Sequence, residues 1–380
     1  MSYAERTKLY EKISDSRKRP LIVYVTSSRQ NASGQMGGDV IPQFAKLLAE
    51  IPAGHENIDI LVVSNGGDPI VPWRIISMVR EKYKKVGVLL PFAAYSAATL
   101  LALGADEIIM HPFSNLGPVD PQLTYQRRAQ GQSPGQEVEV VNFGSEDLRN
   151  FLEFVRSDVG ISDQEQLERA FELVCKDVGA IQIGVAKRST QLALSMSEKL
   201  LSLHLGDTSQ ARAIAEALNR SFYHHGYPVG MSEAKKIGLP VVPAEKDLED
   251  MLWQVWQDVE GEMECNSPFN PVEVVLQNKE ASALLGPVPQ VQLPFNLPQP
   301  LMEQAFNGIL QRIQVVSVPP VDCSVFMATL ECVWCRSEYH QEVRINASRL
   351  PNMSIAVSVV PISTGWTFTR NPNAPQGAEK

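Results

Sequence analysis

The chain has 380 residues, and its 34 Lys and Arg against 43 Asp and Glu give a net charge of −9. A surface with this acidic balance repels phosphate backbones, so the composition argues against a nucleic-acid partner. Hydrophobic residues make up 44% and charged residues 20%, ordinary values for a soluble globular protein that is long enough for two domains.

The ends and the cysteines indicate the compartment. No apolar run of about 18 residues or more is present, so no membrane-spanning helix is expected. Residues 1–19 are polar and lack the apolar core of a secretory signal. The 5 cysteines are an odd number at irregular spacing, which suits a reducing environment better than a disulfide framework. We therefore expect a cytoplasmic protein.

The first half of the chain alternates short apolar, β-rich runs with segments of helical spacing. Four runs predict strands: Leu21–Thr26, Ile58–Ser64, Val86–Pro91 and Glu107–Met110. Three helices are predicted between them: Asp39–Ile51, Val71–Tyr83 and Ser96–Gly104. This alternation favours right-handed crossovers and an α/β fold with a mainly parallel sheet.

The second half begins with a helical block and ends in a β-rich tail. Helical periodicity covers Ser145–Asp158, Ser162–Lys176, Gly179–Leu205 and Ser209–Asn219. Half of the 26 prolines follow residue 265, and the uncharged stretch Leu285–Leu301 is typical of an extended linker. The predicted organisation is an N-terminal helix or arm (1–20), a main domain (21–264), a Pro-rich linker (265–301) and a small β-rich C-terminal module (302–380).

Two loops that directly follow predicted strands carry residue types suited to acyl transfer. The first contains Gly66 and Gly67, whose N–H groups are not obstructed by a Cβ and can bind an oxyanion; the alternative is a tight turn that happens to use glycine. The second places Ser96 at a helix start, as a nucleophile or merely as a capping residue. Because neighbouring parallel strands end at the same sheet edge, the two loops should lie side by side.

The order of these elements resembles the Clp protease/crotonase superfamily. More narrowly, the runs Gly104–Gln122 and His225–Leu239 resemble the serine dehydrogenase proteinase family, which is related to Clp protease and signal peptide peptidase A. The resemblance covers about residues 20–245. It implies a Clp/crotonase-like ββα superhelix, a serine peptidase activity without metal or cofactor, and assembly into homo-oligomers.

Carried over position by position, the resemblance implies Ser96 as the nucleophile. Gly66 and Gly67 match the glycine pair of the oxyanion hole, and the N–H of Ala97 is the expected further donor. These amides would stabilise the negative charge that develops on a substrate carbonyl oxygen.

The resemblance also implies the base and its partner. His225 matches the family's histidine segment, and Asp120 is the candidate acid that fixes its tautomer. Gly226 departs from the aspartate that the family often carries there. Three other bases stay open: the adjacent His224, or Lys176 or Lys187 in a Ser–Lys dyad.

A cysteine motif near the C-terminus has no place in this proposed peptidase site. Cys332 and Cys335 form a CxxC pair, with Cys323 before it and His340 after it. Three cysteines and a histidine could bind zinc, but the spacing lacks a second clean knuckle. The helix that a redox CxxC normally opens is also missing, so buried free thiols are the simplest interpretation.

The sequence therefore favours a cytoplasmic serine hydrolase, most simply a peptidase. Two alternatives stay open: a catalytically inactive scaffold of the same fold, and a crotonase-like acyl-CoA enzyme that uses the oxyanion hole without a nucleophilic serine. The expected partners are a peptide or protein substrate and further copies of the chain, with no nucleic acid and no membrane.

Overall fold

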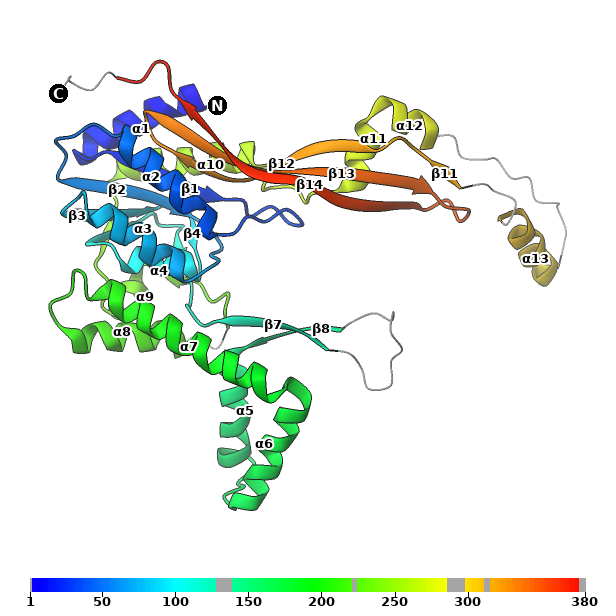
Figure 1. Cartoon of the computed structure of the whole chain (residues 1–380), viewed down its shortest axis with the longest axis horizontal. Coiled ribbons are helices and arrows are strands. Elements are labelled where there is room, and N and C mark those ends of the chain that lie inside the picture. Colours follow the sequence, from blue (N-terminus) through cyan, green and yellow to red (C-terminus); the bar gives the residue numbers. More distant parts are fainter. Residues whose placement is uncertain (1, 128–138, 221–223, 286–297, 311–314, 376–380) are drawn as a thin grey trace.

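A computed structural model describes residues 2–127, 139–220, 224–285, 298–310 and 315–375. Within these residues a nine-stranded sheet has the order β10-β5-β3-β2-β1-β12-β13-β11, with β14 paired to β13. Figure 1 shows a compact body from which a long β ribbon and a pair of helices project.

The body is built on five parallel strands, which confirms the predicted α/β class. They are β1 (Leu21–Thr26), β2 (Asn57–Val63), β3 (Lys85–Leu90), β5 (Glu107–Met110) and β10 (Val241–Pro243). Every residue of β1 is buried, because helices cover both faces of a parallel sheet. Its side chains divide between two cores: Ile22 and Tyr24 enter one, and Val23 and Val25 enter the other.

Helices on both faces complete these cores. One face packs against α2 (Ile41–Glu50), α3 (Ile70–Arg80), α4 (Ala97–Leu103) and the end of α7 (Ala180–Leu201). The other packs against α1 (Tyr3–Arg17) and α10 (Lys246–Glu262). A short helix, η1 (Gly38–Val40), precedes α2. Among the described helices, none combines the length and apolar character needed to cross a bilayer.

A small second sheet holds the candidate loops together. It consists of β4 (Ala93–Ala94), β6 (Asn115–Leu116) and β9 (Val229–Gly230), followed by α9 (Met231–Lys236). β4 pairs with β6 in parallel, and β6 pairs with β9 in antiparallel orientation. Because β4 leads into Ser96 and β9 follows His225, this sheet brings two distant parts of the chain to one place.

The helical block lies between these two segments and matches the prediction closely. A hairpin, β7 (Gln122–Arg127) and β8 (Glu139–Gly144), leads into α5 (Ser145–Ser157), α6 (Gln164–Val178), α7 and α8 (Thr208–Arg220). α5 and α6 form the projecting helix pair in Figure 1. α6 is capped by Asp163, which accepts a hydrogen bond from the Gln166 amide.

The β-rich tail extends the main sheet. β12 (Val321–Glu331) pairs antiparallel with β1, and it is followed by β13 (Cys335–Arg349) and β14 (Ile355–Arg370), with the short β11 (Val316–Ser317) on β13. The segment predicted as a linker, 265–301, contains α11 (Pro271–Gln277) and α12 (Lys279–Leu285) and the start of α13 (Gln299–Leu310). Its first half is therefore helical, and residues 286–297 lie outside the described part.

Candidate active site

Ser96 stands in a strained turn between β4 and α4. Its φ of 53° and ψ of −116° lie in a region that residues with a side chain rarely adopt. Such a conformation costs about 1–3 kcal/mol and persists only where the surroundings enforce it. The Ser96 side chain makes no capping hydrogen bond to α4, so capping does not account for this serine. A sharp, strained turn from strand to helix is the geometry that exposes a nucleophilic hydroxyl.

The glycine loop passes so close to this turn that a side chain would not fit. Gly66 has a φ of 96°, and a Cβ there would lie 2.6 Å from Tyr95 O and 2.8 Å from Ser96 Cβ. A Cβ on Gly67 would lie 2.5 Å from Met36 O. The two loops therefore lie side by side, as the parallel sheet predicted, and the glycines are required for their close approach.

The amides of the loop are not equivalent. The Gly66 N–H donates to Ser64 Oγ at 3.0 Å, and the Thr26 hydroxyl donates to the same oxygen at 2.8 Å. The N–H groups of Gly67 and Ala97 have no hydrogen-bond acceptor among the described residues. In this arrangement Gly66 supplies space for Ser96, while the Gly67 and Ala97 amides remain available as donors.

His225 and Asp120 form a hydrogen-bonded pair although 105 residues separate them. His225 Nδ1 lies 2.8 Å from Asp120 Oδ1, with side-chain exposures of 31% and 13%. Because an ionised carboxylate can only accept, Nδ1 carries the proton of the neutral ring and Nε2 is left as an acceptor. The second carboxylate oxygen, Oδ2, accepts a 2.8 Å hydrogen bond from Gln122 Nε2.

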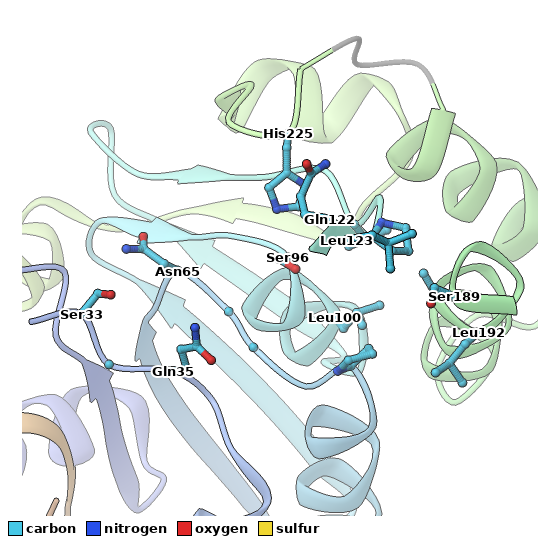
Figure 2. A pocket seen from close by; sticks show the side chains of 17 residues that line it. Ser33, Gln35, Asn65, Ser96, Leu100, Gln122, Leu123, Ser189, Leu192 and His225 are labelled. Carbon is cyan, nitrogen blue, oxygen red and sulfur yellow. The ribbon is translucent and has the colours of Figure 1, made fainter. Parts of the chain in front are cut away.

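Ser96, Gly66, Gly67 and His225 line one cavity of about 450 Å³. Figure 2 shows the His225 ring on one wall and the Ser96 hydroxyl at the start of α4 facing the same space. No hydrogen bond joins these two side chains within the described structure. The other lining side chains are uncharged and mix polar with apolar residues: Ser33, Gln35, Asn65, Gln122 and Ser189, together with Leu100, Leu123 and Leu192.

The alternative bases lie outside the lining of this cavity. His224 is exposed, and its Nδ1 accepts a hydrogen bond from the Gly226 amide at 3.0 Å. Lys176 on α6 and Lys187 on α7 are exposed as well. The structure therefore places His225 in the lining of the cavity that Ser96 also lines and leaves the other three candidates in solvent-facing positions.

Three polar residues of the site had no signal in the sequence. Thr26 ends β1 and Ser64 directly follows the adjacent β2; both are buried, and together they hold the glycine loop. Gln122 is exposed at the start of β7 and reaches back two residues to Asp120. Tyr95, the residue before Ser96, is partly buried, and this burial raises the pKa of its phenol.

The four residues considered for zinc do not assemble. Among the described residues, no group of three or more His, Cys, Asp or Glu side chains could hold a metal ion. Cys323 pairs across the ribbon with Val343, while His340 stacks on Phe326.

Comparison with known proteins gives a family match and two curated relatives. Residues 3–131 match the family described as ClpP-like SDH-type serine proteinase. The chain is 27% identical over 250 residues to the uncharacterized protein MJ0137 of Methanocaldococcus jannaschii, covering 63% of this chain and 75% of that protein. It is 28% identical over 185 residues to the uncharacterized protein MJ1495 of the same organism, covering 48% of this chain and about half (51%) of the relative.

Three solved structures are also similar. A mutant of the 1510-N membrane-bound stomatin-specific protease has a TM-score of 0.32 at 17% identity and covers 60% of this chain and 82% of its own. ClpP1 from Listeria monocytogenes has a TM-score of 0.30 at 14% identity, and the match covers 63% of this chain and 99% of that chain. The ClpP protease catalytic domain from Plasmodium falciparum has a TM-score of 0.33 at 11% identity, and the match covers 65% of this chain and 93% of that chain. The family match, which spans Ser96 and Asp120, confirms the resemblance found in the sequence: residues 3–131 are similar to the ClpP-like SDH-type serine proteinases.

Proposed function

We propose that this chain is a serine peptidase in which Ser96 is the nucleophile, His225 the general base and Asp120 the carboxylate that orients His225. The single observation that carries the proposal is the His225–Asp120 hydrogen bond at the wall of the cavity that also contains the strained Ser96. A serine with a positive φ, facing an imidazole whose free nitrogen can only accept, is an arrangement suited to nucleophilic catalysis.

In the first half of the reaction, Ser96 Oγ forms a bond to the scissile carbonyl carbon, and its proton passes to His225 Nε2. The carbonyl oxygen becomes an oxyanion, for which the Gly67 and Ala97 amides are the proposed donors. The C–N bond then breaks, and the proton on Nε2 leaves with the amine. The Ser96–His225 contact has to tighten when substrate binds, as is common for sites without ligand.

In the second half, water attacks the acyl-enzyme and gives its proton to Nε2. The ester C–O bond breaks, the acid product leaves, and the proton returns to Ser96. Asp120 stays ionised throughout and stabilises the imidazolium that forms twice in each cycle. Gly66 contributes by lacking a Cβ, because a methyl group there would press on Ser96.

A fluorophosphonate probe tests the nucleophile directly. We expect stoichiometric labelling of the wild-type chain on Ser96, located by peptide mass spectrometry, and none of Ser96→Ala. Ser33→Ala is the matched control, because Ser33 is a second hydroxyl at the wall of the same cavity and should not matter for labelling. His225→Ala should slow labelling strongly, whereas His224→Ala should not.

The same experiment separates the proposal from its rivals. A folded wild type that stays unlabelled, and hydrolyses no peptide in a mixed peptide library, would indicate an inactive scaffold. Binding of an acyl-CoA without labelling would instead indicate crotonase-like chemistry at the same amides. Assembly into homo-oligomers stays a prediction that sedimentation of the full chain can test.

A further inference from the structure

The CxxC motif, which the proposed activity does not use, places two thiols against each other. Cys332 follows β12 and Cys335 begins β13, so the two residues flank the turn of the hairpin. Their Sγ atoms lie 3.6 Å apart, and both residues are fully buried. A thiol pair at this distance needs only a small side-chain movement to reach bonding distance, since a disulfide S–S bond is about 2 Å long.

The backbone around the pair is held firmly in place. The Cys332 N–H donates to the Cys335 carbonyl at 2.9 Å, and the Tyr3 hydroxyl of α1 donates to the Cys332 carbonyl at 2.7 Å. Asn371, just after β14, donates through Nδ2 to the Val333 carbonyl at 2.8 Å. Figure 1 shows this end of the ribbon beside α1. The two cysteines therefore meet in a fixed geometry rather than by chance fluctuation.

The two thiols are also chemically unequal. Burial alone raises the pKa of Cys332, but the hydrogen bond from Cys335 and those from the Trp334 and Cys335 backbone outweigh it and lower that pKa. Donating to Cys332, together with burial, raises the pKa of Cys335. Cys332 is thus the sulfur that attacks an oxidant, and Cys335 keeps its proton until the second step.

We propose that Cys332 and Cys335 are a redox-modification site, a buried dithiol that a small peroxide converts into an intramolecular disulfide. In the first step the Cys332 sulfur attacks one peroxide oxygen, the O–O bond breaks, and a sulfenic acid and water form. In the second, the Cys335 sulfur displaces the hydroxyl group from the sulfenic sulfur, which releases a second water. Two thiols are oxidised and one peroxide is reduced, so atoms and electrons balance.

A peroxide is the oxidant class that fits, because neither cysteine has solvent-exposed surface. A bulky disulfide such as oxidised glutathione cannot reach them without opening the hairpin, whereas a small neutral molecule needs a much smaller opening. The charges of the nearby Arg370–Glu50 ion pair act on Cys335. The proposal is independent of the proposed peptidase function.

The test is a count and a location of thiols in the reduced, full-length chain. The protein is treated with hydrogen peroxide, quenched with catalase, unfolded, alkylated and analysed by peptide mass spectrometry. We expect the loss of two hydrogen atoms, with alkylation lost at Cys332 and Cys335 and kept at Cys175, Cys265 and Cys323. Cys323→Ser is the matched control, because Cys323 lies on β12, the strand that leads to Cys332, and its loss should leave the bond intact.

Three outcomes would overturn the proposal: all five cysteines still alkylate, the bond involves Cys323, or the bond persists in Cys335→Ser. If Cys335→Ser does not fold, the alkylation pattern of the wild type decides alone. Oxidised glutathione in place of peroxide should leave the native pair reduced, and equal closure by both reagents would contradict the argument from access.

Discussion

Replacing Gly66 by alanine tests whether the approach of the two loops is as tight as the coordinates indicate. The new Cβ would lie 2.6 Å from Tyr95 O, 2.8 Å from Ser96 Cβ and 2.9 Å from Ala97 N, at a φ of 96°. A positive φ costs a residue with a side chain about 1–2 kcal/mol. Overpacking against backbone that cannot turn away adds about 1–3 kcal/mol. We expect the free energy of unfolding to fall by about 2–5 kcal/mol.

Urea unfolding of Gly66→Ala beside wild type measures this loss, and the rate of fluorophosphonate labelling measures the damage to Ser96. Gly261→Ala is the control, since nothing lies within 4 Å of its added Cβ and the position is helical. That change should raise stability by up to about 1 kcal/mol and leave labelling unchanged. A Gly66→Ala protein that is as stable as wild type and labels at the same rate would refute the close approach of the loops.

Three further changes have definite expected results. Asp120→Asn should slow labelling of Ser96 by about 10³–10⁴-fold at neutral pH, because an amide no longer selects the His225 tautomer with a free Nε2; an unchanged rate would remove Asp120 from the mechanism. Arg6→Met should lower the free energy of unfolding by about 3 kcal/mol in urea titrations, because it removes one of the two cations that pair with the fully buried Glu331 carboxylate. An unchanged free energy of unfolding would show that the remaining cation, Arg336, suffices. Burial lowers the pKa of His204, whose Nε2 lies 2.9 Å from the Leu103 carbonyl oxygen. As pH falls, the unfolded chain therefore binds a proton at this histidine before the folded chain does, so the free energy of unfolding should decrease below about pH 6.5. His204→Gln should flatten this pH dependence.

The nucleophile side of the site could be predicted from the sequence because it rests on local rules. Buried parallel strands appear as apolar runs, and the loops at their carboxyl ends meet at one edge of the sheet. Ser96 and the glycine pair each directly follow such a run, so their proximity needed no knowledge of the rest of the chain. What periodicity could not supply was which amide remains free, because that depends on the Ser64 hydroxyl, a side chain buried two residues before Gly66.

The position of the C-terminal strands, by contrast, could not be predicted from the sequence. They were recognised as β-rich, but a pattern of apolar residues does not say which sheet they join. β12 lies against β1 through an antiparallel register that pairs Val23 with Glu331, and nothing in either run specifies that partner. The buried Glu331 makes sense only when Arg6 of α1 arrives beside it at 2.8 Å. Such contacts depend on tertiary structure, and local sequence carries no trace of them.

His225 and Asp120 could be chosen from the sequence, but the contact between them depends on tertiary structure. His225 and Asp120 were chosen by resemblance, and they meet although a hairpin and four helices separate them in the chain. The short pairing of β6 with β9 explains how: it holds the strand that follows His225 beside the one that precedes Asp120. The geometry of the pair therefore depends on two short strands rather than on the helical block. Disrupting that pairing should uncouple His225 from Asp120 while Ser96, held by β4 and α4, keeps its strained turn.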